Sequence, residues 1–373
     1  MTQRQSARDL GLAPGILPPG PLNALTDVPG VRVGQVTLRR GSGIRTGVTA
    51  IVPDAVDRAG GTLPAGLFVG NGFGKLIGAT QLVELGAIET PIVLTGTLSA
   101  FRAADALVTY LLALPGNEGL VTVNPVVGET NDGYLSDIRA RPVTEDDVLA
   151  AIRGAVTGPV DQGAVGAGTG TTALGFKAGI GTASRQVRLP GGAPCTVGVL
   201  VQANFAGTLT VAGTLTVGGT RISPDLALPG AVEPGAAAAL AATGKPAEPG
   251  TEPNSCMIIV GVDACLDSRQ LTRVARRAVF AMARTGSDFT AGSGDYAIAF
   301  ATRAGAPVPE DHLGPVFAAA MEAVEEAILN SLFLAETTTG YHGHVRQAVP
   351  LGYLVRACRA TASPADRPPG TGL

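Results

Sequence analysis

A serine at the start of an apolar segment is the first residue with an evident chemical capacity. Ser255 follows Asn254 and opens the run Cys256–Val262, which is typical of a buried strand. A cut between Asn254 and Ser255 would give the serine a free α-amine. With an ordinary pKa near 8, that amine can act as general base for the hydroxyl of its own residue. The alternative is that Ser255 only caps a linker before a strand.

A hydroxyl and a carboxylate form the second group with chemical potential. Ser293 and Asp295 stand two residues apart at the entrance of an expected strand, 296–302. Side chains at i and i+2 of a strand point to the same side. The spacing therefore predicts that these two groups act together.

A polar loop supplies further candidates. Residues 128–134, the sequence GETNDGY, follow an expected strand at 121–123 and include Glu129 and Tyr134. Polar loops between apolar elements often carry sites, although a solvated turn is the alternative. Asn204 stands in a similar position, at the end of an expected strand over 195–203.

Three other patterns bear on metal or phosphate chemistry. Gly70–Lys75 is glycine-rich, but Leu76 follows Lys75 where a P-loop requires Ser or Thr, so a tight turn is favoured. His342 and His344 form H-x-H without a third ligand at metal-binding spacing, which favours solvent exposure. The cysteines show no C-x-x-C spacing, so we expect reduced thiols and no disulfide or zinc site; they are Cys195, Cys256, Cys265 and Cys358. No metal and no cofactor are expected.

Composition limits the partners. The 373-residue chain is 45% hydrophobic, which is ample for a core, and its 52 glycines with only 4% aromatic residues predict tight layering of small side chains. The net charge of −3 and the lack of a Lys/Arg cluster accompanied by aromatic residues argue against nucleic acid. No apolar run reaches the roughly 18 residues of a membrane span, and no secretory leader is evident. A soluble cytoplasmic protein is expected, without a membrane partner.

The elements that position these groups follow from periodicity and turn residues. They predict an α/β domain interrupted by one Pro-rich linker. The expected strands are 31–38, 48–52, 67–69, 91–95, 121–123, 195–203, 257–262 and 296–302, and the expected helices are 76–84, 98–114, 144–154, 316–335 and one that begins at Asp267 or Ser268. The expected organisation is a flexible arm at 1–22, a first part of the domain at 23–224, a flexible linker at 225–254, a second part of the same domain at 255–361 and a disordered tail at 362–373.

Several strings together resemble one family. They are LTDVPGV at 25–31, RTGVTAI at 45–51, VGETNDG at 127–133, GIGTASR at 179–185, the pair Asn254-Ser255, Asp263-Ala264 and GSGD at 292–295. In these strings the chain resembles the DmpA-type L-aminopeptidase/D-amidase/esterases and the β-peptidyl aminopeptidases. The resemblance implies an αββα sandwich of the DmpA/ornithine-acetyltransferase-like type, with an N-terminal nucleophile. It further implies autocleavage into two chains that stay associated, commonly as a tetramer of such pairs.

The resemblance also implies roles for single residues. By position, Ser255 resembles the family's nucleophile. Ser293 and Asp295 resemble the pair that orients this nucleophile and holds its α-amine. Asn204 resembles the amide of the oxyanion hole. Glu129 resembles the carboxylate that binds the substrate's amino group, with a structural role in the turn as the alternative. Tyr134 resembles a tyrosine near the same pocket.

Departures from the family leave alternatives open. Asp295 stands where relatives carry glutamate, which shortens the reach by one methylene, and Gly96 stands where relatives often have asparagine. Cys256 could attack in place of Ser255, although only Ser255 fits the family's spacing to Asp263 and Ser293. The substrate is expected to be a short peptide, amide or ester with an N-terminal L-α, D-α or β-amino acid. The alternatives are an amidase for amide oligomers, an acyltransferase, whose relatives use threonine, and a non-catalytic protein that binds a small molecule.

Overall fold

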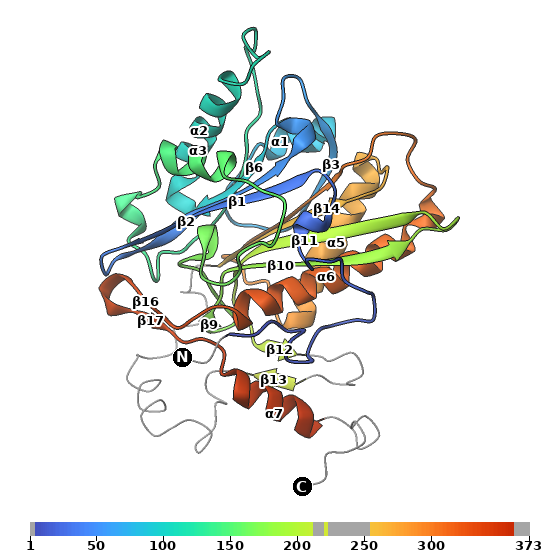
Figure 1. The fold of residues 1–373 in the computed structure, drawn as a ribbon. Helices are drawn as coiled ribbons and strands as arrows, with labels where there is room; N and C mark the ends of the chain where they lie inside the picture. Colours follow the sequence, from blue (N-terminus) through green and yellow to red (C-terminus); the bar gives the residue numbers. More distant parts are fainter. Residues whose placement is uncertain (1–3, 212–219, 223–253, 362–373) are drawn as a thin grey trace.

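Two stacked sheets form the centre of the molecule, as Figure 1 shows for a computed structural model that describes residues 4–211, 220–222 and 254–361. The first sheet has the order β1-β2-β6-β7-β4, and the second has the order β10-β11-β14-β15-β3-β5. The strands of the first sheet, in that order, are Val31–Arg40, Ile44–Pro53, Ile92–Gly96, Val126–Thr130 and Leu76–Ile77. Those of the second are Ile180–Arg188, Pro194–Asn204, Ser255–Val262, Gly294–Ala301, Leu63–Gly72 and Ala87–Ile88. Short two-stranded pairs complete the strands: β8 Thr172–Ala173 with β9 Phe176–Lys177, β12 Leu209–Val211 with β13 Thr220–Ile222, and β16 Thr338–Thr339 with β17 Val345–Arg346.

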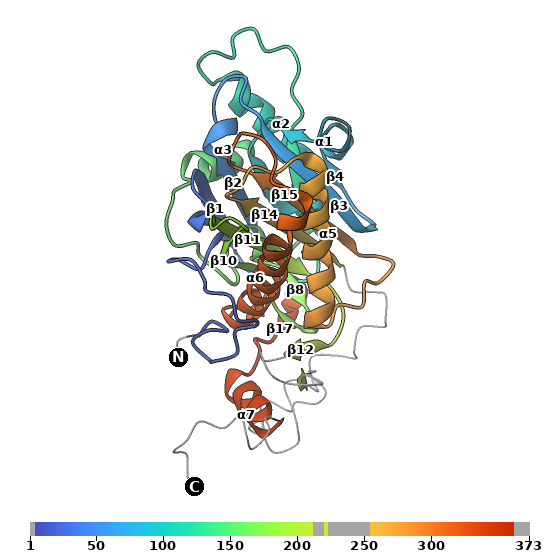
Figure 2. The same cartoon turned by 90° about the vertical axis from the view of Figure 1, so that its right-hand side faces the viewer.

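Helices cover the outer face of each sheet. The α-helices of the described residues are α1 Ala79–Leu85, α2 Ala100–Leu112, α3 Glu145–Arg153, α5 Ser268–Thr285, α6 Gly314–Phe333 and α7 Leu351–Thr361, and of these α2, α3, α5 and α6 cover the two sheets. Helices α2 and α3 share a core cluster with the first sheet, while α5 and α6 share another with the second sheet. A third cluster lies between the two sheets. Figure 2 shows α5 and α6 side by side on one outer face. The order of layers is therefore αββα.

The position of β14 between two other strands explains why its sequence after Ser255 is apolar. It pairs antiparallel with β11 on one side and parallel with β15 on the other, and all eight of its residues are buried. Cys256, Ile258 and Val260 join the core beneath α5 and α6, whereas Met257 and Ile259 join the core between the sheets. A strand covered on both faces needs apolar side chains at odd and even positions alike.

Glycines allow the helices to approach the sheets closely. A Cβ added at Gly181 of β10 would lie 1.8 Å from the carbonyl oxygen of Ala327 in α6. A Cβ added at Gly34 of β1 would lie 2.0 Å from the carbonyl oxygen of Ala151 in α3. Both distances are too short for a side chain, so the small residues serve helix-on-sheet packing in both layers.

Helix starts follow the sequence prediction closely. Thr144 caps α3 by accepting from the backbone N–H of Asp147, and Asp267 caps α5 by accepting from that of Gln270. These contacts satisfy backbone N–H groups that have no partner within the helix. None of the helices in the described parts of the chain is long and apolar enough to cross a membrane.

Two predicted boundaries differ from the structure. Residues 121–123 form no strand; the strand is β7, which starts at Val126 and carries Glu129 in its ladder with β6. Residues 70–72, expected in a turn, complete β3, and the chain then forms β4 before α1. In both places pairing with a neighbouring strand overrides the local glycine and polar content. Apart from Asn254, the predicted linker from residue 225 lies outside the described residues, as does the predicted tail.

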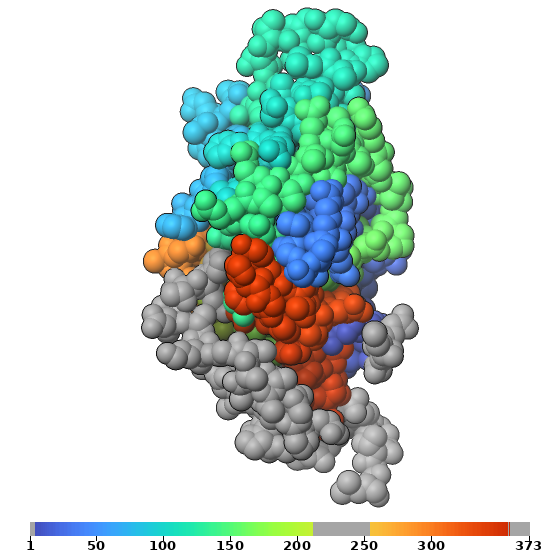
Figure 3. Space-filling model, turned by 90° about the vertical axis from the view of Figure 1, so that its left-hand side faces the viewer, coloured from blue at the N-terminus to red at the C-terminus, as the bar shows by residue number. Residues whose placement is uncertain are grey.

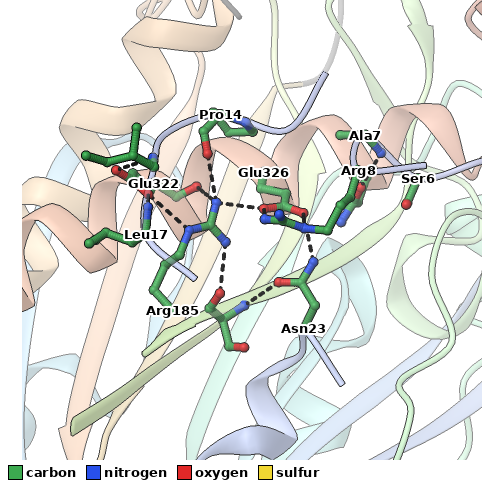
Figure 4. A network of polar contacts seen from close by, with 12 residues as sticks. Ser6, Ala7, Arg8, Pro14, Leu17, Asn23, Arg185, Glu322 and Glu326 are labelled. Atoms are coloured by element: carbon green, nitrogen blue, oxygen red, sulfur yellow. Dashed lines mark hydrogen bonds and ion pairs between the residues drawn. The ribbon is translucent and has the colours of Figure 1, made fainter. Parts of the chain in front are cut away.

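The N-terminal arm is tied to the body by a buried polar network (Figure 4). Residues 4–22 form no strand or α-helix, which agrees with their proline content. Arg8 pairs with Glu326 of α6 at 2.7 Å, and the backbone N–H of Leu17 donates to Glu322 at 3.0 Å. Proline content alone does not predict such an attachment.

Arg185 is the centre of this network. It pairs with Glu326 at 2.6 Å and with Glu322 at 3.1 Å, and it donates to the carbonyl of Pro14 at 2.9 Å. The side chains of Arg185 and Glu326 are both 0% exposed. A buried charge is tolerated only when it is paired and hydrogen-bonded, and both conditions are met here.

We predict that Glu326→Gln lowers the free energy of unfolding by about 3–5 kcal/mol, because it leaves the buried Arg185 with one carboxylate fewer. Chemical unfolding at a fixed protein concentration measures the change. Glu310→Gln is the matched control, since Glu310 pairs with Arg269 and Arg273 at the surface, and we expect little change there. Equal effects of the two substitutions would contradict the assignment of the network as a structural clamp.

Candidate active site

Three strand ends meet at one edge of the second sheet. Ser255, the first residue of β14, lies directly opposite Asn204, the last residue of β11. On the other side of β14, Cys256 is in register with Asp295 near the start of β15. The strand pairing thus brings together residues that are about 50 and 40 positions apart in the chain.

Ser255 contacts the peptide bond that precedes it. The side chain is buried, and its Oγ donates a short hydrogen bond to the carbonyl oxygen of Asn254. The side-chain Nδ2 of Asn254 donates to Thr290 Oγ1 at 2.9 Å. The hydroxyl and the carbonyl with which it would react are therefore held together on a buried strand end.

The amide of Asn204 is oriented by two backbone groups. Its Oδ1 accepts from the N–H of Thr172 at 3.0 Å, and its Nδ2 donates to the carbonyl of Asn131 at 3.1 Å. Because a backbone N–H must face Oδ1, the amide nitrogen is directed to the opposite side. Asn204 is 1% exposed. This arrangement suits an amide that donates to a developing oxyanion.

Ser293 and Asp295 form a direct pair. Ser293 Oγ donates to Asp295 Oδ1 at 2.7 Å, and Asn71 Nδ2 donates to the Ser293 carbonyl at 2.6 Å. Asp295 Oδ2 is buried and has no hydrogen-bond partner among the described residues. Burial raises the pKa of Asp295 to about 6, while the bond from Ser293 acts in the opposite direction. An incoming cation would satisfy Oδ2.

Glu129 presents one bonded and one free oxygen. Its Oε1 accepts from the backbone N–H of Lys75 at 2.9 Å and lies 3.4 Å from Lys75 Nζ. Its Oε2 is buried and has no hydrogen-bond partner within the part of the chain that the structure describes. The segment that carries Lys75 also borders Ser293, since the N–H of Phe73 donates to the Ser293 carbonyl at 3.2 Å. Glu129 thus lies close to the strand ends described above.

Tyr134 belongs to an aromatic cluster with His344 and Arg346. Its ring stacks on His344 at 4.5 Å between centroids, and Arg346 Cζ lies 3.9 Å from the ring centroid. His344 also contacts the Tyr134 carbonyl at 2.8 Å. His344 is therefore half-buried against a tyrosine rather than solvent-exposed as its spacing suggested. Figure 3 shows this C-terminal segment at the surface, beside the hairpin of β1 and β2.

Cys256 occupies an environment that opposes thiolate formation. The side chain is 0% exposed and packs in the core beneath the helices. Burial raises the pKa of the Cys256 thiol well above its ordinary value, and the charge of Asp295 adds to that effect. A cysteine of this kind is a poor nucleophile.

A buried lysine supports the site and was not anticipated from the sequence. Lys177 Nζ donates to the carbonyls of Gly168, Thr171 and Ala178, and burial lowers the pKa of Lys177 to about 7. The loop that it closes contains Thr172, whose N–H orients Asn204. The signal was available: a lone lysine stands in an otherwise small and apolar stretch, residues 173–181.

Asp132 explains the glycine at position 96. Asp132 is buried, and burial raises the pKa of its carboxyl group to about 7. A Cβ added at Gly96 would lie 3.0 Å from both carboxyl oxygens of Asp132 and 3.1 Å from Thr46 Oγ1. In this chain the carboxylate fills the space into which a side chain at position 96 would project.

In residues 4–211, 220–222 and 254–361, no three His, Cys, Asp or Glu side chains are placed to hold a metal ion. The polar groups at the strand ends are a hydroxyl, an amide and carboxylates. Such a set is suited to acyl transfer through an oxygen nucleophile.

The chain belongs to peptidase family S58, whose profile matches residues 23–346. It is 39% identical to the "Beta-peptidyl aminopeptidase BapA" of Sphingosinicella microcystinivorans over 365 residues, which cover 92% of this chain and 89% of the relative. The family resemblance inferred from the motifs is therefore confirmed.

Two solved structures are similar over nearly the whole chain. A Burkholderia sp. beta-aminopeptidase has a TM-score of 0.80 and 37% identity, with 98% of this chain and 100% of the other covered. The L-aminopeptidase D-Ala-esterase/amidase of Ochrobactrum anthropi has a TM-score of 0.81 and 33% identity, with 95% and 98% covered. That enzyme is a variant of the Ntn hydrolase fold. The predicted fold class is confirmed, and the chain is a hydrolase of the aminopeptidase type.

We predict that Asp295→Asn raises the melting temperature at about pH 8 more than at about pH 4, in a Ser255→Ala background. The raised pKa means that folded Asp295 keeps a proton that the unfolded chain, with an ordinary value of 3.8, releases. The resulting stability is present below about pH 4 and is lost as the pH rises through about 6. Thermal unfolding at both pH values provides the test, and an equal difference at both would contradict a buried, titrating carboxyl.

Proposed function

We propose that this chain is a self-processing serine aminopeptidase that removes an N-terminal residue from short peptides, amides or esters through an aminoacyl-enzyme on Ser255. The observation that carries the proposal is the buried Ser255 hydroxyl bonded to the Asn254 carbonyl, with Asn204 directly across the sheet. The relatives named as aminopeptidases support the same reading.

Maturation would use the serine against its own preceding peptide bond. Ser255 Oγ attacks the carbonyl carbon of Asn254, the Oγ proton passes to the amide nitrogen, and the C–N bond breaks to leave an ester. Water then hydrolyses the ester, which gives a carboxylate on Asn254, frees the hydroxyl and leaves a free α-amine on Ser255. The fragments are residues 1–254 and 255–373 of one folded domain.

Turnover would repeat this chemistry on a substrate. The α-amine of Ser255 takes the hydroxyl proton as Oγ attacks the substrate carbonyl, then returns the proton to the leaving amine. Asn204 stabilises the oxyanion, and water releases the aminoacyl group. In the protonated form the α-ammonium would lie within reach of Asp295, whose Oδ2 has no other partner in the described chain. The shorter carboxylate at position 295 is aimed by Ser293.

Recognition of the substrate's amine would fall to Glu129. Its free Oε2 is buried, and a buried carboxylate strongly favours a cationic partner. An internal peptide bond has no such amine beside it, so attack is confined to the first residue. Acceptance of L-α, D-α and β-amino acids stays within the proposal, since the relatives' names include both β-peptidyl and L-amino activities.

We also propose that the fragments stay paired and that the pairs assemble into a tetramer, as the family resemblance implies. The central position of β14 between β11 and β15 supports the pairing, because separation would expose a strand buried on both faces. The four cysteines show no C-x-x-C spacing, which supports a reducing, cytoplasmic location.

We predict that Ser255→Ala yields one inactive chain that migrates at the full 37.3 kDa on a denaturing gel, because both steps need the same oxygen. Wild-type protein should give two bands, with an amino-terminal sequence that begins at Ser255. Cys256→Ala is the matched control and should still be cut. Cleavage of the Ser255→Ala chain, or a second fragment that begins at Cys256, would overturn the nucleophile assignment.

We predict that Glu129→Gln lowers kcat/KM for substrates with a free amine by about 10- to 150-fold, the value of a charge-assisted hydrogen bond. Self-cleavage should be spared, because the bond at Asn254 has no free amine to recognise. N-acetylated substrates should be poor for both forms. If Glu129→Gln lowered kcat/KM less than about threefold while self-cleavage stayed normal, we would assign recognition of the amine to Asp132 instead.

A further inference from the structure

A lysine lies beside the carboxylate that is assigned to the substrate's amine. Lys75 Nζ is 3.4 Å from Glu129 Oε1 and 2.7 Å from Thr97 Oγ1. The Lys75 side chain is 35% exposed, whereas that of Glu129 is 3% exposed. The Lys75 side chain is therefore partly accessible from solvent, and the Glu129 carboxylate is buried beside it. An ammonium has three donors, so two protein oxygens leave one for a ligand.

The position of this pair relative to the nucleophile is set by the segment 73–75. A Cβ added at Gly74 would lie 3.0 Å from Glu129 Oε1 and 3.8 Å from the Cα of Gly294. Cys256 of β14 is in register with Asp295 of β15. Gly294, which precedes Asp295, therefore lies beside Ser255, which precedes Cys256. The Lys75–Glu129 pair therefore borders the strand end that carries the nucleophile.

The charge of the pair matters for the choice of substrate. A lone substrate ammonium would be attracted by Glu129 and repelled by Lys75, so Lys75 weakens the net attraction. A substrate whose N-terminal residue carries both an ammonium and a carboxylate would place the ammonium at Glu129 and the carboxylate at Lys75. The free Oε2 of Glu129 would accept from the ammonium, and Lys75 would donate to the carboxylate.

We propose, on the basis of the function proposed above, that the Glu129–Lys75 pair selects N-terminal residues whose amine and a free carboxylate share one carbon. Such residues are joined to the next one through their side-chain carboxyl, and β-aspartyl is the shortest of them. A β-aspartyl residue has the same backbone as β-alanine, with one added carboxylate on the amine-bearing carbon. The β-peptidyl name of a 39% identical relative makes this spacing the natural one to test.

The test compares three p-nitroanilides that differ at one group: β-aspartyl, its α-carboxamide and β-alanyl. We expect the cut wild-type enzyme to show a kcat/KM for the β-aspartyl compound about tenfold or more above that for β-alanyl, with no such gain for the neutral α-carboxamide. Lys75→Met should lower the ratio of β-aspartyl to β-alanyl about tenfold. Lys75→Arg keeps the charge and should retain most of the ratio.

The possible failures are distinguishable. A wild-type enzyme that cleaves β-alanyl p-nitroanilide but does not favour the β-aspartyl compound overturns this inference and leaves the proposed function intact. A ratio that Lys75→Met does not change also overturns it and indicates that Lys75 only neutralises Glu129. An enzyme cut at Ser255 that cleaves no substrate with a free amine would remove both proposals.

Discussion

The register of β14 is the constraint on which the site depends. Ser255 lies opposite Asn204 because β14 pairs with β11 at one fixed alignment, and Cys256 lies beside Asp295 because β14 pairs with β15 at another. A slip of one residue would exchange the faces of every side chain in the strand. Cys256 would then take the place of Ser255, and Met257 would enter the core beneath the helices. The apolar packing on both faces thus protects the chemistry at the end of the strand.

Desolvation is the second condition that shapes the site. The carboxylates of Glu129, Asp132 and Asp295 are buried, and each keeps one oxygen without a hydrogen-bond partner among the described residues. Burial of an oxygen without a hydrogen-bond partner is unfavourable unless a donor joins it. For two of them the proposed mechanism supplies one: the new α-amine of Ser255 at Asp295, and the substrate's ammonium at Glu129. In the uncut, substrate-free chain, Asp295 and Glu129 therefore each have a buried oxygen that would gain a partner only on the proposed cleavage and substrate binding.

Much of this arrangement could be predicted from the sequence, because it depends on local signals. The change from linker to apolar run identified Ser255, the i, i+2 spacing paired Ser293 with Asp295, and the caps Thr144 and Asp267 set two helix starts. The fold class followed from the motifs. What could not be predicted depends on contacts between distant segments.

Lys75 and Lys177 illustrate that limit. Lys75 was considered only as part of a failed phosphate-binding pattern, and its partner Glu129 is 54 residues away. Glu129 itself was assigned to a loop, although it pairs in the ladder of β6 and β7. Lys177 meets backbone carbonyls, which carry no signature in the side-chain sequence. Periodicity describes which face of an element is buried, and it does not say which two elements meet.

The buried network at the N-terminal arm acquires a second meaning once the chain is cut. Arg8, Asn23 and Arg185 belong to the first fragment, whereas Glu322 and Glu326 belong to the second. After the proposed cleavage, the ion pairs that hold the arm would become contacts between two chains. Arg185 and Glu326 are fully buried, so separation of the fragments would expose or strand their charges as well as the apolar core. The polar clamp and the central strand would therefore hold the proposed fragments together from two parts of the fold, so that the Asn254–Ser255 bond could be broken without loss of the structure that positions Ser255.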